Sequence, residues 1–230
     1  MEGDSMPTLI QVTKEKEIWE NIIDVPIFAD FLLSAEIQCD INALQQAAFK
    51  WKSNEQSHSR SNKGGWQSDF ILSRDTQQQE FLKLFDNVNA FVQYAIKSKF
   101  NATIESDYTG WWCNINRLNS YNILHHHQRA DVVGVFYVKS DPDASELQLL
   151  RNDGSGYGSL YDRMVIDGKN KDATIVNVTP IEGRLYLFPG HLWHHVNTQE
   201  VDKERISVSY NFFATNSIQE AVHRRYPNGQ

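Results

Sequence analysis

Hydrophobic residues in the first 100 positions recur at helical spacing. One apolar stripe consists of Ile41, Leu44, Ala48 and Trp51. Asp40 stands directly before it and fits an N-cap, because a carboxylate there accepts hydrogen bonds from the free backbone N–H groups of the first turn. A second stripe begins at Phe81 and continues toward Lys97, with Asp75 as the candidate cap. The sequence therefore predicts two amphipathic helices in this part.

After residue 100 the period of the hydrophobic pattern falls to two, which is typical of strands with one buried face. Short connections join eight such runs, near residues 109–117, 121–127, 131–139, 146–151, 173–178, 184–188, 192–196 and 205–213. A parallel sheet would need helices between its strands, so this pattern favours an antiparallel sandwich or jelly roll. Two earlier strands are predicted near Leu9–Val12 and Val25–Leu33. The expected fold class is mainly β with N-terminal helices.

The segments between these elements define the expected organisation. The stretch 53–69 lacks periodicity and is expected to be a loop with His58 on its surface. The stretch 152–172 is rich in Gly and Asp and too long for a hairpin turn, so we expect a lid or binding loop. We expect one domain over residues 1–230, with a disordered leader (1–8), a helical support region (9–107), a β core (108–213) and a tail with a short helix (214–230).

Composition narrows the class of protein. The net charge of -7 argues against binding to nucleic acid through the overall field of the protein, so no stable nucleic-acid partner is expected. The sequence contains no run of 18 apolar residues, so it predicts no transmembrane helix, and the acidic start MEGDSMPT does not resemble a signal peptide. Cys39 and Cys113 are expected to be buried free thiols, which indicates an intracellular, cytoplasmic location. The oligomeric state stays open.

Three consecutive histidines, His125 to His127, end one of the alternating runs. On a strand, His125 and His127 point to one side and His126 to the other, so the outer two can chelate one metal ion. A third ligand must come from elsewhere, and the candidates are His191, His194 and His195. The turn Phe188-Pro189-Gly190 would aim His194. Imidazole ligands suit Zn, Cu, Fe and Ni, although a histidine triplet alone is equally compatible with a structural role.

The last predicted strand has a polar face and an apolar face. Arg205, Ser207, Ser209 and Asn211 share one face, and Ile206, Val208, Tyr210 and Phe212 share the other. Arginine is suited to hold a carboxylate through two parallel charge-assisted hydrogen bonds, and Ser207 adds a donor on the same face. Taken alone, Arg205 could be a core residue in a salt bridge. Together with the histidines, it indicates a site for a metal and a buried carboxylate.

These residues resemble the Fe(II)- and 2-oxoglutarate-dependent oxygenases, in particular a subgroup with an H-x-H motif. The resemblance covers roughly residues 108–213 and rests on five ordered blocks, which are Trp112 to Arg117, His125 to His127, Val133 to Tyr137, Leu187 to His194 and Glu204 to Asn211. It implies a double-stranded β-helix, a cupin-like jelly roll.

The resemblance also implies roles for individual residues. His125 and His194 would be iron ligands, and Arg205 with Ser207 would hold the far carboxylate of 2-oxoglutarate. Many relatives have His-x-Asp, whereas this chain has His127 in place of the Asp. Because the ligand carboxylate is missing, the metal in this chain would keep a higher net positive charge. Asp131 is the alternative ligand, but along a strand it lies about 13 Å from His127.

Two further residues are candidates for contact with the co-substrate. They are Tyr137 and Asn116, the latter sharing a strand face with Asn114. A core tyrosine and ordinary hydrogen bonding within the sheet are equally good interpretations.

The implied cofactors are Fe(II), 2-oxoglutarate and O2, and the catalytic set is His125, His127, His194 and Arg205. The implied reaction is oxidative decarboxylation of 2-oxoglutarate to succinate and CO2, coupled to oxidation of a substrate by hydroxylation. A small molecule or a protein side chain is the favoured substrate, over a nucleobase. Two alternatives are a cupin-type metalloenzyme that does not use 2-oxoglutarate and a non-catalytic β-sandwich binding module.

Overall fold

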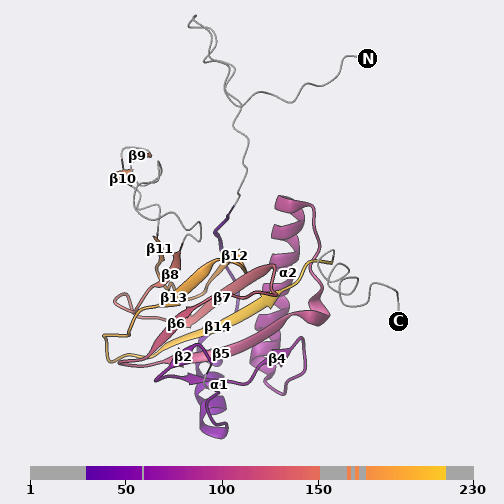
Figure 1. The fold of residues 1–230 in the computed structure, drawn as a ribbon. Helices are drawn as coiled ribbons and strands as arrows, with labels where there is room; N and C mark the ends of the chain where they lie inside the picture. The colour runs from indigo at the N-terminus through magenta and orange to yellow at the C-terminus, as the bar shows by residue number, and fades with distance from the viewer. Residues whose placement is uncertain (1–29, 59, 151–164, 167–168, 171–174, 216–230) are drawn as a thin grey trace, which may run out of the picture. The chain divides into compact units, whose positions relative to one another are not determined.

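The computed structural model describes residues 30–58, 60–150, 165–166, 169–170 and 175–215 (Figure 1). By its internal contacts the chain divides into two units, residues 1–31 and 32–230, and the elements below belong to the second. The predicted strand at Leu9–Val12, the leader, most of the 152–172 loop and the tail from residue 216 lie outside the described residues.

Helix α1 (Ile41–Asn54) begins where the sequence predicts. The carboxylate of Asp40 accepts a hydrogen bond from the backbone N–H of Ala43 at 3.0 Å, and Leu44, Ala48 and Trp51 are buried. Helix α2 (Gln79–Phe100) begins four residues after the predicted cap Asp75, so that prediction is wrong. The N–H of Asp75 instead donates to the carbonyl of Leu72, which closes a turn ahead of the helix.

Two antiparallel sheets form the β core of the described residues. The larger has seven strands, in the order β1 (Leu33–Glu36), β12 (Arg184–Pro189), β7 (Val132–Lys139), β14 (Arg205–Phe212), β5 (Gly110–Asn116) and β3 (Trp66–Gln67), with β4 (Ile71–Leu72) also on β5. The smaller has the order β11 (Ile175–Val178), β8 (Leu147–Leu150), β13 (Trp193–Val196), β6 (Tyr121–His125) and β2 (Asn62–Lys63). β9 (Val165–Ile166) pairs only with β10 (Lys169–Asn170), and a 3-10 turn spans Ser106–Tyr108.

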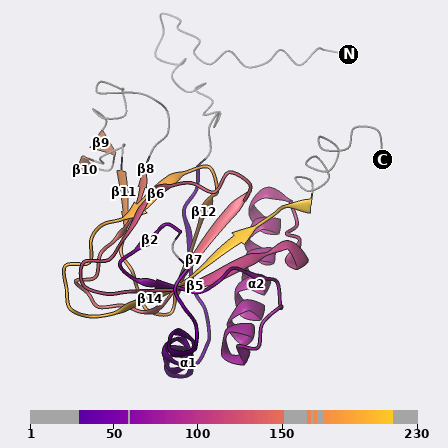
Figure 2. The same ribbon diagram turned by 60° about the horizontal axis from the view of Figure 1, so that its bottom comes forward.

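Both helices cover one face of the larger sheet (Figure 2). Aromatic rings join the two layers, because Trp111 on β5 lies 6.0 Å from Trp51 of α1 and 6.0 Å from Phe81 of α2 between ring centroids. The apolar face of β14 is buried there, and its polar face is left to point the other way, toward the smaller sheet. This arrangement makes room for a polar site between the sheets.

The predicted fold class is confirmed as a mainly β protein with N-terminal helices and jelly-roll sheets. Each of the eight predicted runs corresponds to an observed strand. The predicted loop 53–69 is partly wrong, because β2 and β3 lie within it. The predicted strand Val25–Leu33 is also wrong where it can be compared, since residues 30–32 are not in a strand and β1 begins at Leu33. The two-residue strands β2 and β3 are stabilised by pairing with neighbouring strands and not by a local hydrophobic pattern.

Two smaller expectations can also be compared. Cys39 and Cys113 are both free thiols; Cys113 is buried and Cys39 partly buried. None of the described helices combines the length and hydrophobicity that a membrane span needs.

Candidate metal centre

His125, His127 and His194 come together in space, and we call them the histidine cluster. His125 on β6 and His194 on β13 are directly paired across the smaller sheet, with ring centroids 4.3 Å apart. The ring of His127 lies 5.2 Å from that of His125 and 5.0 Å from that of His194. One nitrogen from each ring lies within 4.8 Å of the others, so the three can hold a single metal ion.

His127 reaches the cluster although β6 ends at His125. Its backbone N–H donates to the carbonyl of Gly190 at 2.8 Å. The approach depends on glycine, because a Cβ at position 190 would stand 1.9 Å from the carbonyl oxygen of Ala130. The turn that was predicted to aim His194 therefore also positions His127.

Each ring of the cluster has its Nδ1 paired with a carbonyl oxygen. His125 Nδ1 lies 2.7 Å from the Ile123 carbonyl, His194 Nδ1 lies 2.9 Å from the Leu192 carbonyl, and His127 Nδ1 contacts the side-chain carbonyl of Asn211. Carbonyl oxygens only accept, so Nδ1 carries the proton and Nε2 presents a lone pair. This is the tautomer that binds a metal through Nε2.

Burial keeps the cluster neutral. It lowers the pKa of His127 to about 4 and that of His194 to about 3, and it lowers the pKa of His125 as well. Neutral imidazoles are the form that binds metal ions. The cluster thus has both the geometry and the protonation state that a metal requires.

Arg205 is buried, and no acidic side chain among the described residues pairs with it. Its side chain is 2% exposed, one Nη donates to the carbonyl of Ser145 at 2.6 Å, and its Nε has no hydrogen-bond partner. Among the described residues, no ion pair involves Arg205, whereas the neighbouring Glu204 pairs with Lys52 and Lys139. The structure therefore does not support a salt-bridged core residue. A buried guanidinium of this kind is suited to an anionic ligand.

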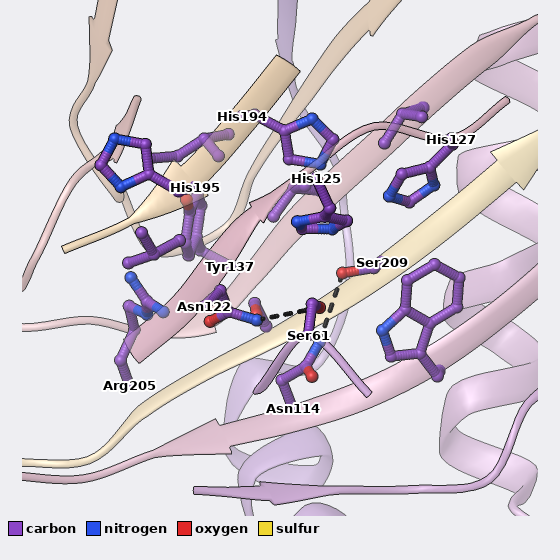
Figure 3. Close-up of a pocket in the computed structure, with 16 residues that line it drawn as sticks. Ser61, Asn114, Asn122, His125, His127, Tyr137, His194, His195, Arg205 and Ser209 are labelled. Atoms are coloured by element: carbon purple, nitrogen blue, oxygen red, sulfur yellow. Dashed lines mark hydrogen bonds between the residues drawn. The ribbon is translucent and has the colours of Figure 1, made fainter. Parts of the chain in front are cut away.

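The histidine cluster and Arg205 line one pocket between the two sheets, which we call the central pocket (Figure 3). The three rings of the histidine cluster lie together at one end, and Arg205 lies at the other. Its lining residues are Ser61, Trp112, Asn114, Asn122, His125, His127, Val133, Val135, Tyr137, Leu147, His194, His195, Val196, Arg205, Ser207 and Ser209.

The polar face of β14 connects the two ends of the central pocket. From Arg205 it passes through Ser207 and Ser209 to Asn211, which contacts His127. Across the sheet, Ser207 stands between Tyr137 and Asn114. Strand alternation, as the sequence predicted, places all these β14 side chains on the pocket side.

Tyr137 lies in the central pocket, and Asn116 does not. Tyr137 is 1% exposed, and burial raises its pKa to about 12, so its hydroxyl keeps its proton and can donate. Asn116 donates through its side-chain amide to Asn122 at 3.3 Å, outside the pocket lining. Asn116 is therefore not among the residues that line the pocket, whereas Asn114, one strand repeat away, is.

His127, and not Asp131, belongs to the cluster. A carboxylate oxygen of Asp131 accepts a hydrogen bond from the backbone N–H of Ala214 at 2.8 Å, and Asp131 is not part of the histidine cluster. Of the other histidines, His191 is exposed, His195 lines the pocket, and His126 packs against Trp193.

A register shift in β6 brings an unpredicted residue, Asn122, into the pocket. His194 pairs with His125, but Val196 pairs with Asn122, so two residues of β6 between these pairs oppose one of β13, as in a β-bulge. Both Asn122 and His125 therefore face the pocket, which strict alternation forbids. Trp112, whose indole stacks on His127 at 5.8 Å, and Ser61 were also missed. The two residues at the shift, Ile123 and Leu124, are both exposed apolar side chains.

Known proteins resemble the chain in sequence and in fold. Residues 110–211 match the sequence profile of a family described as "Putative 2OG-Fe(II) oxygenase". A prolyl-4-hydroxylase from Pseudomonas putida superposes with a TM-score of 0.56 and 14% identity, covering 79% of this chain and 91% of that chain.

Two further solved structures share the fold. A prolyl hydroxylase from Trichoplax adhaerens, in complex with a hypoxia inducible factor peptide fragment, has a TM-score of 0.59 and 14% identity over 83% of this chain and 86% of that one. HygX from Streptomyces hygroscopicus, with nickel and 2-oxoglutarate bound, has a TM-score of 0.54 and 10% identity over 80% and 83%.

A search of curated proteins finds no match. The expected cofactors, Fe(II), 2-oxoglutarate and O2, are those of the matched family. Residues 110–211 of this chain thus match a family of 2OG-Fe(II) oxygenases, and the solved structures show that the fold is shared.

Proposed function

We propose that this chain is a hydroxylase that uses Fe(II), 2-oxoglutarate and O2, with His125, His127 and His194 as the iron ligands. One observation carries the proposal. Three neutral imidazoles and a buried guanidinium without an acidic partner line the same pocket. A metal with an attached dicarboxylate satisfies both ends of such a pocket.

The residues present fit the metal. The donor set is three imidazole nitrogens, which suits Fe(II), and each Nδ1 is already engaged so that Nε2 is available. When bound, the group supplies the oxidation, in which 2-oxoglutarate loses CO2 to become succinate and an oxygen atom passes to the substrate. The protein's own contribution is to fix the rings and to shield the site from water.

Arg205 is suited to hold the far carboxylate of 2-oxoglutarate. Its Nε lacks a hydrogen-bond partner among the described residues, and the hydroxyls of Ser207 and Tyr137 lie on neighbouring strands of the same pocket wall. Burial keeps water away from the guanidinium, which strengthens a charge-assisted pair. The co-substrate would thus extend from Arg205 along the polar face of β14 to the histidine cluster.

The substrate proposed is a small molecule or a protein side chain. Support comes from solved structures of similar fold, which include prolyl hydroxylases, one with a peptide, and SnoK, a carbocyclase of nogalamycin biosynthesis. The fold alone is shared at these identities, so hydroxylation is proposed from the likeness and not carried over as a fact. The free thiols Cys39 and Cys113 support a reducing compartment such as the cytoplasm.

Turnover of 2-oxoglutarate tests this proposal against its alternatives. The protein with Fe(II), ascorbate and O2 is expected to convert 2-oxoglutarate slowly to succinate even without its substrate, with one O2 consumed per succinate. The Arg205→Ala variant is expected to need far more 2-oxoglutarate. Metal-dependent O2 consumption without succinate would support the cupin-type alternative. A folded protein that binds neither metal nor 2-oxoglutarate would support the binding module.

A further inference from the structure

None of the described residues that line the central pocket is acidic. These sixteen residues include one cation, Arg205, and no Asp or Glu. Of the nearby carboxylates, that of Asp131 is bonded to the backbone of Ala214, and that of Glu146 accepts from the hydroxyl of Thr179 at 3.0 Å without lining the pocket. Among the described residues, therefore, no carboxylate lines the pocket to neutralise positive charge there.

The consequence for the loaded pocket follows from the proposed function, on which this inference rests. A divalent metal and Arg205 bring more positive charge than one 2-oxoglutarate dianion compensates. In relatives with His-x-Asp, the ligand carboxylate neutralises this excess positive charge. His127, in contrast, is neutral when it binds a metal. One positive charge remains in a buried environment, where an unpaired charge is costly.

Two hydrogen-bonded relays also direct donors into this pocket. In the first, Asn62 donates to Asn114 at 3.4 Å, and Asn114 donates to the hydroxyl oxygen of Ser209 at 3.3 Å. The oxygen of Ser209 is thus an acceptor already, which leaves its own O–H free to donate. Ser209 lines the pocket (Figure 3), so this proton faces a ligand.

The second relay starts from Asn116, on the same strand β5 as Asn114, and passes through β6. Asn116 donates to Asn122 at 3.3 Å, and Asn122 donates to the hydroxyl oxygen of Ser61 at 3.4 Å. Ser61 also lines the pocket and keeps its O–H for a further acceptor. Consecutive donations polarise one another, so both hydroxyls become better donors. Asn116, which does not reach the pocket, acts there through this relay.

We propose that the substrate of this oxygenase is an anion that brings a carboxylate into the central pocket, beside the bound 2-oxoglutarate. The carboxylate would neutralise the remaining positive charge and accept from the hydroxyls of Ser61 and Ser209. A neutral molecule of the same shape satisfies neither requirement, so the pocket selects by charge.

The test compares propionate with propionamide, which match in shape and differ in charge. The full-length protein is loaded with Co(II) and saturating 2-oxoglutarate without O2, and each probe is titrated at constant ionic strength. Binding is followed by calorimetry and by the visible spectrum of Co(II). Propionate is expected to bind saturably and at least about tenfold more tightly than propionamide.

Two variants separate the causes. His127→Asp restores a carboxylate. It is expected to weaken the binding of propionate about tenfold and to leave the binding of propionamide unchanged. His126→Asp is the matched control, because it adds the same charge on a side chain that packs against Trp193 outside the cluster. Ser209→Ala is expected to weaken propionate a fewfold without changing Co(II) affinity.

The outcomes separate this inference from the proposed function. Equal binding of the two probes by the wild-type protein, or propionate that displaces 2-oxoglutarate, would overturn the inference alone. Chloride that binds as tightly as propionate would also overturn it, because the pocket would then take any monoanion. Failure of Co(II) and 2-oxoglutarate to bind at all would overturn the proposed function and the inference together. The comparison in the wild-type protein decides the question even if a variant fails to fold.

Discussion

The side-chain carbonyl of Asn211 contacts Nδ1 of His127, and this contact joins the last polar residue of β14 to the histidine cluster. The other two cluster histidines are oriented by backbone carbonyls, whereas His127 depends on a side chain. The same strand carries Arg205 at its other end. One strand therefore positions a proposed iron ligand, His127, and the proposed carboxylate clamp, Arg205, in a fixed relationship.

Replacing Asn211 tests its role as a positioning residue. Asn211→Leu removes the acceptor with little change in size, and we expect metal affinity to fall about 10- to 100-fold, the usual cost of losing such a partner. Asn211→Asp keeps an acceptor and is expected to restore binding. Competition with a fluorescent chelator measures both. Ser209→Ala, which alters the same face without touching a cluster ring, should bind metal normally.

A purely structural role for Asn211 makes a different prediction. In that case the Leu variant would lose melting temperature, and the Asp variant would not recover metal affinity. Unchanged metal affinity in a stable Leu variant would contradict the positioning role.

We expect Arg205 to lower the stability of the ligand-free protein and to be needed for binding 2-oxoglutarate. A buried guanidinium without a carboxylate is costly, so Arg205→Met should leave the ligand-free protein as stable as the wild type or more stable by about 1–2 kcal/mol. The same change should abolish stabilisation by 2-oxoglutarate. Thermal unfolding with and without metal and 2-oxoglutarate measures both effects. Marked destabilisation of the ligand-free variant would mean that Arg205 is a structural residue.

The affinity for 2-oxoglutarate should fall in Arg205→Ala by an amount that matches a lost charge-assisted pair, on the order of 2–3 kcal/mol. The affinity of Arg205→Lys for 2-oxoglutarate should lie between those of the wild type and the Ala variant, because lysine keeps the charge but loses the two parallel hydrogen bonds. Glu204→Gln changes the partly exposed neighbour and serves as control. An unchanged apparent affinity in the Ala variant would remove Arg205 from this role.

Two glycines provide a matched pair for the turn that positions His127. Gly190→Ala places a Cβ 1.9 Å from a backbone oxygen, so the turn must move, and we expect loss of more than about 2 kcal/mol together with weaker metal binding. Gly183→Ala has nothing within 4 Å and costs only its positive φ of 79°, roughly 1 kcal/mol. Urea unfolding compares them. Equal effects on metal affinity would show that the turn does not position His127.

Acid should destabilise the metal-free protein. The folded-state pKa values of the cluster histidines lie below the ordinary value of 6.5, so the unfolded chain binds more protons below that pH. Stability is therefore complete above about pH 6.5 and falls as the pH drops toward 4, by up to about 1.4 kcal/mol per pH unit and histidine. Urea unfolding with a chelator at pH 7.5 and 5.5 measures the slope. His194→Asn should flatten it, and an unchanged slope would contradict this origin.

The sequence predicted most of the fold because hydrophobic period is a local property. The strands of the β core and the helix that begins after Asp40 all follow from it. The short strands β2 and β3 do not, since their stability comes from pairing with β6 and β5, which local residues do not encode. The start of α2 was missed because Gln78 makes no side-chain cap.

The site was predictable where alternation is regular and unpredictable where it is broken. Arg205 and Ser207 face the pocket as the period of β14 requires. Asn122 faces the pocket only through the register shift in β6. Asn116 does not line the pocket, and its side-chain amide donates a hydrogen bond to Asn122. The side of His127 was predicted correctly, although it is set by the bond to Gly190 and not by a strand.

The central claim is that the histidine cluster and Arg205 hold one metal with 2-oxoglutarate attached. Anaerobic titration of the protein with Fe(II) and 2-oxoglutarate tests it most directly, because an iron–2-oxoglutarate chelate has a visible metal-to-ligand charge-transfer band. We expect the band to appear at one equivalent of Fe(II), to vanish in His194→Ala and to require much more 2-oxoglutarate in Arg205→Ala. A well-folded wild-type protein that develops no band would contradict the account.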